Sequence, residues 1–290
     1  MAPAGDPQDT FGAAAVAKCD LTAAAEAGIV RPVMSSALGK LNMRLAVVLP
    51  LLLSAAGCPV TQPQQTPVQA SRAEEPKSGA GYWLYVPSYY SDQRDWPLVV
   101  TLHGTFGWDN SSDQIREWKF LAEKHGLIVA APDLRSVQGI LPVVRSLWRK
   151  DLQADEKAIL SIVDELCGKY RIDPNAVLLT GFSAGGYPLY YVGLRNPRRF
   201  NMLIARACNS DLELFEQLDF SEAVRKLPVA IFWGKDDLAE LQSQSWQAFR
   251  YLREHGCLET QRKEVIGGHL RRPEFAYSLW RKYLPKRHRM

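Results

Sequence analysis

The segment 178–186 contains a serine in a pattern typical of an enzymatic nucleophile. An apolar run is followed here by Gly-Phe-Ser-Ala-Gly, with Ser183 at the centre. In a Gly-x-Ser-x-Gly turn, a sharp passage from strand to helix lifts the serine hydroxyl clear of a sheet. The turn crowds its own backbone, and Gly181 and Gly185 leave room for it. The pattern predicts Ser183 as a nucleophile; the alternative is an ordinary glycine-rich turn between a strand and a helix.

A serine hydroxyl is a weak nucleophile and needs a base, most often a histidine, to take its proton. The chain has five histidines. Only His269 follows a late predicted strand on a small-residue turn, Gly267-Gly268, from which an imidazole can reach across the sheet. We therefore predict His269 as the base; the alternative is a structural role.

The base in turn needs an acid that fixes its tautomer and stabilises the imidazolium ion. The strand predicted over 228–233 ends in Gly-Lys-Asp-Asp. We predict Asp237 as this acid, with Asp236 as the alternative. The resulting chain order, Ser183, Asp237, His269, is the order found in α/β-hydrolases.

Acyl transfer by a serine also needs an oxyanion hole, in which two backbone N–H groups stabilise the charge on the acyl oxygen. Ala184, directly after the nucleophile, is one expected donor. The second is expected in the loop His103–Gly107, whose sequence His-Gly-Thr-Phe-Gly follows a predicted strand. Thr105 is the first choice in this loop and Phe106 the alternative, while His103 is expected to stabilise the loop.

The elements that must position these residues alternate between apolar strands and helices from Gly81 onward. This alternation predicts an α/β fold with a mostly parallel sheet covered by helices on both faces, and with its site at the carboxyl ends of the strands. The expected strands are 82–87, 97–102, 127–131, 176–180, 202–207, 228–233 and 263–266. The expected helices are 112–125, 151–170, an elbow helix ending at Leu194, 240–255 and 271–283.

From about Gly81 to Leu284 the chain resembles α/β-hydrolase esterases of the polyhydroxybutyrate depolymerase and feruloyl esterase-like type. The matching residues are Leu102-His103-Gly104, Tyr170-x-Ile172-Asp173, Gly181–Gly186, Gly234-x-x-Asp237 and Gly267-Gly268-His269. The resemblance implies hydrolysis of carboxylic esters, with short acyl, hydroxyacyl or aromatic groups, through an acyl-enzyme. The loop His-Gly-Thr-Phe-Gly departs from the Cys/Gly-rich loop that is more usual in the depolymerases.

Access to the site is predicted from the connections between strands. About twenty residues join the strands expected at 202–207 and 228–233, which predicts no large cap. Trp108, just beyond the oxyanion loop, and Trp148, in the irregular stretch 134–150, are candidate substrate-binding residues. The alternatives are a surface-loop anchor for Trp108 and a helix packed on the core for Trp148.

A bacterial lipoprotein signal is indicated upstream of this domain. Met43 and Arg44 precede a 12-residue apolar run, and Ala-Ala-Gly stands directly before Cys58. We therefore predict a signal peptide over 43–57 and a lipid anchor at Cys58, which would export the protein to the periplasm or cell surface of a bacterium. A buried core helix or strand at 45–56 is the alternative.

The remaining boundaries follow from that signal. Residues 1–42 are expected to be a non-native upstream extension or disordered, with Met43 as the true start. Residues 58–80, rich in Pro, Gln, Ser and Glu, are expected to be a flexible tether, and 81–290 the catalytic domain.

Composition argues against several other classes of protein. The net charge is only +4, 47% of the residues are hydrophobic, and neither a phosphate-binding loop nor zinc-ligand spacing is present. We predict no cofactor, no metal and no nucleic-acid partner, and expect the basic C-terminal tail to be a solvated, frayed helix end. For Cys167, Cys208 and Cys257, one disulfide and buried free thiols both remain open.

Two other functions fit the same residues. A serine peptidase of the prolyl oligopeptidase type shares the triad order, although residues 81–290 leave no room for its propeller. A surface binding protein on a non-catalytic hydrolase fold is the second alternative, although no catalytic position is replaced here.

Overall fold

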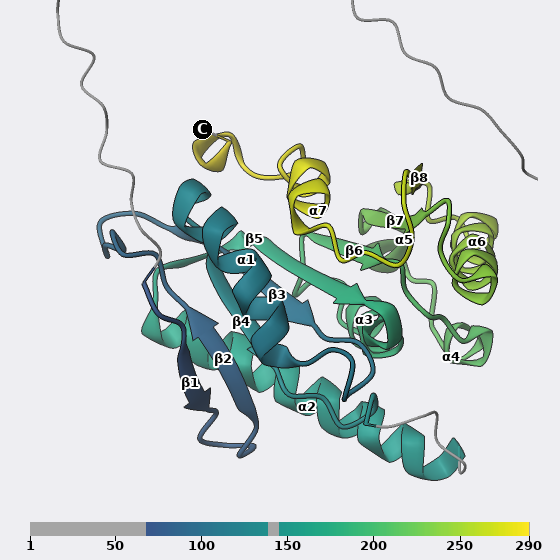
Figure 1. Ribbon diagram of the computed structural model, residues 1–290, viewed down its shortest axis with the longest axis horizontal. Helices are drawn as coiled ribbons and strands as arrows, with labels where there is room; N and C mark the ends of the chain where they lie inside the picture. The colour runs from purple at the N-terminus through teal and green to yellow at the C-terminus, as the bar shows by residue number, and fades with distance from the viewer. Residues whose placement is uncertain (1–67, 139–144, 290) are drawn as a thin grey trace, which may run out of the picture. The chain divides into compact units, whose positions relative to one another are not determined.

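A computed structural model describes residues 68–138 and 145–289, which belong to one compact unit of the chain. Within these ranges an eight-stranded sheet has the order β1-β2-β4-β3-β5-β6-β7-β8 (Figure 1). Strands β3 to β8 run parallel, whereas β1 and β2 pair antiparallel. The predicted α/β fold with a mostly parallel sheet is confirmed. The bounds are β1 Ser71–Glu74, β2 Gly81–Tyr85, β3 Trp96–Leu102, β4 Ile128–Pro132, β5 Ile172–Phe182, β6 Met202–Arg206, β7 Val229–Gly234 and β8 Thr260–Val265.

Helices cover both faces of the sheet (Figure 1). Successive side chains on a strand point to opposite faces, so β3 contributes Val99 to one apolar core and Leu98 and Val100 to the other. Helices α1 and α7 cover the first core, and α2, α3 and α6 cover the second. Their bounds are α1 Ser111–His125, α2 Arg145–Lys169, α3 Gly186–Arg195, α6 Ala239–Glu254 and α7 Pro273–Trp280.

The connection from β6 to β7 is short in structure as well as in sequence. It contains two five-residue helices, α4 (Leu212–Glu216) and α5 (Glu222–Lys226). The other short elements are two 3₁₀ turns, η1 (Ser183–Gly185) and η2 (Lys286–His288). In the described ranges, no helix combines the length and the hydrophobicity needed to cross a bilayer.

Helix α1 starts directly after the loop that follows β3. The side chain of Asn110 caps it by accepting a hydrogen bond of 3.0 Å from the Asp113 amide. Gly126 ends it in the left-handed conformation, with its amide bonded to the Ala122 carbonyl. The Asn110 cap fixes the start of α1, directly after Asp109, at the carboxyl edge of the sheet.

The folded region starts earlier than expected. Ser71–Glu74 forms strand β1, whose residues pair with Gly81–Leu84 of β2. The prediction of a flexible tether is therefore wrong for residues 71–80, because this polar segment satisfies the backbone groups along the outer edge of β2. The extension 1–42, the signal peptide 43–57 and Cys58 lie outside the described residues.

The end of the chain also differs from its prediction. His288 of η2 is buried, and its Nε2 lies 2.8 Å from Oδ2 of the buried Asp173 at the start of β5. Arg287 donates to the same oxygen over 2.5 Å. The prediction of a solvated, frayed terminus is wrong at His288, which is buried against this carboxylate, whereas Arg287 contacts the carboxylate but stays exposed.

These contacts predict a loss of stability in acid. Burial by itself would raise the pKa of Asp173, but the Asn175 amide, the His288 ring and Arg287 together hold it below its ordinary value. Because the folded-state pKa is depressed, the stabilisation is present above the unfolded-state pKa of about 4 and is lost as the pH falls through the folded-state value.

Asp173→Asn is expected to lower the free energy of unfolding at pH 7 by about 2 kcal/mol, since hydrogen bonds to a charged group are lost. It should also flatten the dependence of that free energy on pH below about 4. Urea unfolding from pH 3 to 7 measures both effects. An unchanged pH dependence would show that Asp173 does not carry it.

Candidate active site

The backbone at Ser183 is strained. Its φ angle is 53°, in the left-handed region that non-glycine residues seldom occupy, directly between β5 and the start of α3. The turn is tight enough that a Cβ atom on Gly181 would lie 2.5 Å from the Gly185 carbonyl oxygen. This is the geometry expected of a nucleophile elbow, and it leaves Ser183 partly exposed at the carboxyl edge of the sheet.

His269 and Asp237 are in contact. The imidazole Nδ1 of His269 lies 3.0 Å from Oδ1 of Asp237, whose side chain is fully buried. A carboxylate only accepts hydrogen bonds, so Nδ1 carries the proton and Nε2 is left able to accept one. The structure brings Asp237 to the imidazole, whereas Asp236 is exposed.

The loops that carry these two residues are packed directly on each other. A Cβ atom on Gly234 would lie 2.1 Å from the Gly267 carbonyl oxygen, so only glycine permits the approach. The same carbonyl accepts a hydrogen bond of 3.0 Å from the Asp236 amide. Backbone packing therefore brings the acid and the histidine together.

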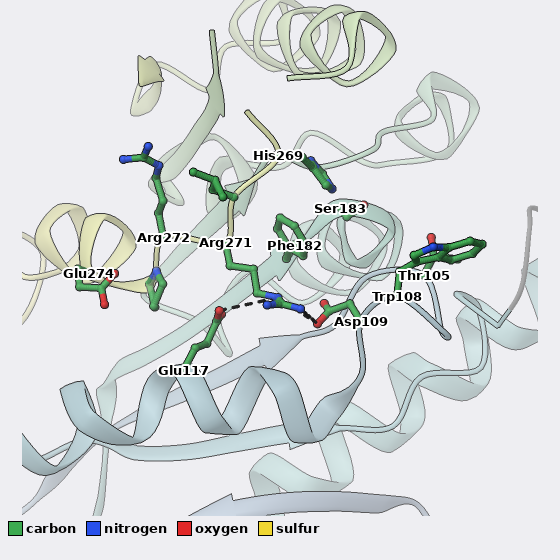
Figure 2. A pocket seen from close by; sticks show the side chains of 12 residues that line it. Thr105, Trp108, Asp109, Glu117, Phe182, Ser183, His269, Arg271, Arg272 and Glu274 are labelled. Carbon is green, nitrogen blue, oxygen red and sulfur yellow. Dashed lines mark hydrogen bonds and ion pairs between the residues drawn. The ribbon is translucent and has the colours of Figure 1, made fainter. Parts of the chain in front are cut away.

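Ser183 and His269 line the same cavity, which has a volume of about 660 Å³ and is within the usual range for small-molecule sites (Figure 2). The ring of Phe182 lies 4.6 Å from the His269 ring, measured between centroids. The cavity is lined by Thr105, Trp108, Asp109, Glu117, Phe182, Ser183, His269, Leu270, Arg271, Arg272, Pro273 and Glu274.

The loop after β3 is held by His103, which is buried. The Leu134 amide donates to its Nε2 over 3.1 Å, so Nδ1 carries the proton and donates to the Gly104 carbonyl over 2.8 Å. In a trans peptide the N–H and C=O point in opposite directions, so this bond orients the Thr105 N–H away from His103. Burial lowers the pKa of His103, which favours the neutral ring that both bonds require.

The two candidate amides in this loop differ. The Phe106 amide donates to the Val137 carbonyl over 3.0 Å. The Thr105 amide bonds to no residue in the described part of the chain, and Thr105 lines the cavity. Ala184 is the second residue of η1, in the first turn, where amides lack an intrahelical acceptor. Thr105 and Ala184 can thus offer N–H groups next to Ser183, while Phe106 has its own acceptor.

The two candidate tryptophans lie in different environments. Trp108 is 74% exposed and lines the cavity. Trp148 is only 3% exposed, donates to the Ser136 carbonyl over 3.1 Å and packs its ring against the edge of Tyr187. The prediction of a substrate-binding Trp148 is contradicted, because α2 begins at Arg145 and directs this side chain into the core. Residues 139–144 of the stretch 134–150 lie outside the described residues.

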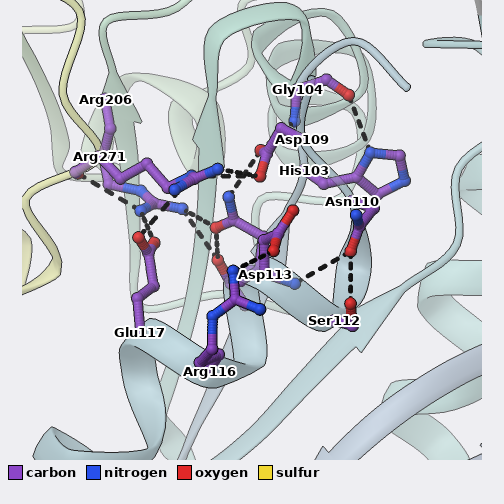
Figure 3. A network of polar contacts seen from close by, with 12 residues as sticks. His103, Gly104, Asp109, Asn110, Ser112, Asp113, Arg116, Glu117, Arg206 and Arg271 are labelled. Carbon is purple, nitrogen blue, oxygen red and sulfur yellow. Dashed lines mark hydrogen bonds and ion pairs between the residues drawn. The ribbon is translucent and has the colours of Figure 1, made fainter. Parts of the chain in front are cut away.

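Four charged residues beside the cavity were missed by reasoning from sequence. Arg206, at the end of β6, is fully buried and lies 2.7 Å from Glu117, while Arg271 lies 2.9 Å from Asp109 (Figure 3). Arginine at the end of an otherwise apolar strand was the one available signal, since a buried charge requires partners. The identity of those partners depends on the fold.

Neither a metal site nor a disulfide is found within 68–138 and 145–289. Cys167, Cys208 and Cys257 are all free thiols, so the disulfide alternative is not realised. Burial raises the pKa of Cys208 to about 12, which suppresses the thiolate form near the site.

Comparisons with known proteins agree with this fold. The family model described as "Esterase: Putative esterase" matches residues 74–263. A ferulic acid esterase from Anaeromyces mucronatus superposes with a TM-score of 0.56 at 16% identity, covering 70% of this chain and 85% of that one. An S-formylglutathione hydrolase from Agrobacterium tumefaciens gives 0.51 at 18% identity, covering 76% and 93%.

Two curated relatives are similar over part of their length. The bifunctional acetylxylan esterase/xylanase of Neocallimastix patriciarum is 30% identical over 163 residues, 56% of this chain and 22% of the relative. Dipeptidyl-peptidase 5 of Porphyromonas gingivalis is 24% identical over 184 residues, 59% and 25%. The chain thus spans about a quarter of these relatives. With the family model matched over more than half of its length, the chain belongs to the esterase family, and the superposed structures show that it has an α/β-hydrolase fold.

Proposed function

We propose that this esterase cleaves esters through an acyl-enzyme on Ser183, with His269 as general base and Asp237 as its acid. The observation that carries the proposal is the 3.0 Å contact between His269 and the buried Asp237, at a cavity that also contains Ser183. A base oriented by a buried carboxylate beside an exposed hydroxyl is what nucleophilic catalysis requires.

The reaction then follows in two steps. Ser183 Oγ attacks the ester carbonyl carbon as His269 Nε2 takes the hydroxyl proton, and Asp237 stabilises the resulting imidazolium. The amides of Thr105 and Ala184 stabilise the oxyanion, and collapse of the intermediate releases the alcohol with the proton from His269. Water, deprotonated by His269, attacks the acyl-enzyme in the same way and releases the acid.

The substrates that we propose are esters of short acyl, hydroxyacyl or aromatic acids. The cavity combines aromatic surface from Phe182 and Trp108 with charged groups, and the short β6–β7 connection adds only α4 and α5. The names of two relatives, an acetylxylan esterase and a ferulic acid esterase, support acyl groups of this size. The hydroxyacyl esters rest on the resemblance to polyhydroxybutyrate depolymerases.

A peptidase is the second candidate function, favoured by the similarity to dipeptidyl-peptidase 5. Such an enzyme would use the same triad on an amide bond. A non-catalytic binding protein is the third, and it predicts no turnover at all.

Activity on p-nitrophenyl esters of graded chain length and on feruloyl esters tests the proposed enzyme. Ser183→Ala and His269→Ala are each expected to lower kcat by about 10⁴-fold or more, because triad members act as a unit. Asp237→Asn should cost far more than Asp236→Asn, its matched control, which should leave kcat within a few-fold.

Ester turnover that survives Ser183→Ala would contradict the proposal. Turnover of dipeptide amides alone would favour the peptidase, and turnover of neither class the binding protein.

His103→Leu tests the oxyanion loop. Without the bond to the Gly104 carbonyl, the Thr105 amide loses its orientation, and kcat is expected to fall by about 10²-fold with KM little changed. His125→Leu is the matched control, since His125 stacks on Tyr277 at the end of α1. Equal kcat values for His103→Leu and His125→Leu would show that His103 does not orient the oxyanion loop.

We also propose that the protein is exported and lipid-anchored at Cys58, on the strength of the signal-like run before it. Labelling of cells with a radioactive fatty acid should mark the wild-type protein and not Cys58→Ser, with Cys167→Ser as the control. Label that persists in Cys58→Ser would contradict the lipid anchor. A peptide from residues 20–40 in the isolated precursor would contradict the start at Met43.

A further inference from the structure

Asp109 is the most heavily bonded carboxylate at the site. Its Oδ2 accepts from the Gly104 amide over 2.6 Å and from Gln114 over 2.8 Å. Its Oδ1 accepts a hydrogen bond of 3.1 Å from Arg271 Nε and forms an ion pair with Arg271 Nη2 at 2.9 Å. The Asp109 side chain is 4% exposed, so these bonds are shielded from water and from salt.

Two of the three partners of Asp109, Gly104 and Arg271, belong to different loops of the site. Gly104 directly precedes Thr105, and a Cβ atom on Gly104 would lie 3.0 Å from the Ser183 Cβ. Arg271 lies two residues after His269. Asp109 therefore joins the loop that offers an oxyanion donor to the loop that carries the base, across 162 residues of sequence.

Arg271 is also held by contacts with Phe182 and Arg206. Its guanidinium lies over the ring of Phe182 at 5.5 Å, and its backbone carbonyl accepts from Arg206. The buried Arg206 also forms an ion pair with Glu117 of α1 (Figure 3). It donates hydrogen bonds to Thr101 of β3 and to Thr180 of β5. Arg206 thus links Arg271 to the central strands β3 and β5.

We propose that the Asp109–Arg271 pair is a clamp that positions His269 and the Thr105 amide relative to Ser183. The inference rests on the proposed serine mechanism and adds two positioning residues to it. Arg271 also lines the cavity, so a role in binding substrate is the competing explanation. The two roles predict different kinetics, because misplaced catalytic groups lower kcat, whereas lost uniform binding raises KM.

The test is a double-mutant cycle on ester hydrolysis with Asp109→Asn, Arg271→Met and the double variant. Each single variant is expected to lower kcat by about 10- to 100-fold with KM within about threefold. The double variant should lose little more than the worse single variant, since both remove one clamp. Arg271→Lys keeps the charge without the two-nitrogen contact and should fall between Arg271→Met and wild type.

A second readout separates positioning from general destabilisation. The rate of covalent labelling of Ser183 by a small fluorophosphonate should fall in parallel with kcat, because the reagent needs nucleophile, base and oxyanion donors but no ester binding. Arg287→Met is the matched control, because it also removes an arginine from a buried carboxylate, here Asp173. The exposed fraction of the side chain is 55% for Arg287 and 31% for Arg271. Asp173 lies at the opposite end of β5, about 20 Å from Ser183 along the strand.

Raised KM with wild-type kcat and labelling would overturn the clamp and make Arg271 a substrate-binding residue. Additive losses in the double variant, or an equal loss of kcat in Arg287→Met, would overturn it as well. If the clamp variants keep the wild-type kcat while Ser183→Ala is inactive, the clamp is disproved and the proposed serine mechanism stands. A wild-type protein without serine-dependent turnover sinks the proposed function, and the clamp with it.

Discussion

The left-handed backbone at Ser183 is the constraint on which the rest of the site depends. A non-glycine residue in this region costs about 1–3 kcal/mol and persists only where neighbouring structure holds it. Here β5 lies in the middle of the sheet between β3 and β6, and the Ser183 carbonyl accepts from the Asn209 amide over 2.9 Å. The strain places the hydroxyl at the sheet edge where the loops after β3, β7 and β8 converge.

Beneath that edge, buried charge restricts how the strands can be arranged. Arg206 and Arg271 are balanced by Glu117 and Asp109, and Arg206 is fully buried. An ion taken out of water is costly unless it is paired and hydrogen-bonded, so alternative packings that break these pairs are disfavoured. Burial raises the pKa of Glu117 and Arg206 opposes that effect, which shows how closely the two depend on each other. The network therefore favours one arrangement of the strands beneath the cavity.

Family membership and site geometry answer different questions. The family model shows the family, and the superposed structures show the fold. Neither shows the substrate, because many functions share this architecture and differ in their loops. The loops of this chain decide which groups reach the cavity. Trp108 is exposed there, Leu270 lines its wall, and Arg271 and Arg272 bring charge to a position beside the apolar Phe182.

Local patterns in the sequence determined the elements and the identity of the central residues. Alternating apolar strands and helices predicted the parallel sheet, and short motifs at strand ends singled out Ser183, His269 and the pair Asp236 and Asp237. The prediction of the sheet is confirmed because strand burial depends on residues close together in the chain. Only the tertiary structure decided which partner each group finds. In it, Asp237 contacts His269, and the Phe106 amide donates a hydrogen bond to the Val137 carbonyl. Trp148 packs in the core, β1 pairs with β2, and Asp109 forms an ion pair with Arg271. Each of those outcomes depends on distances between segments far apart in sequence, which no local pattern records.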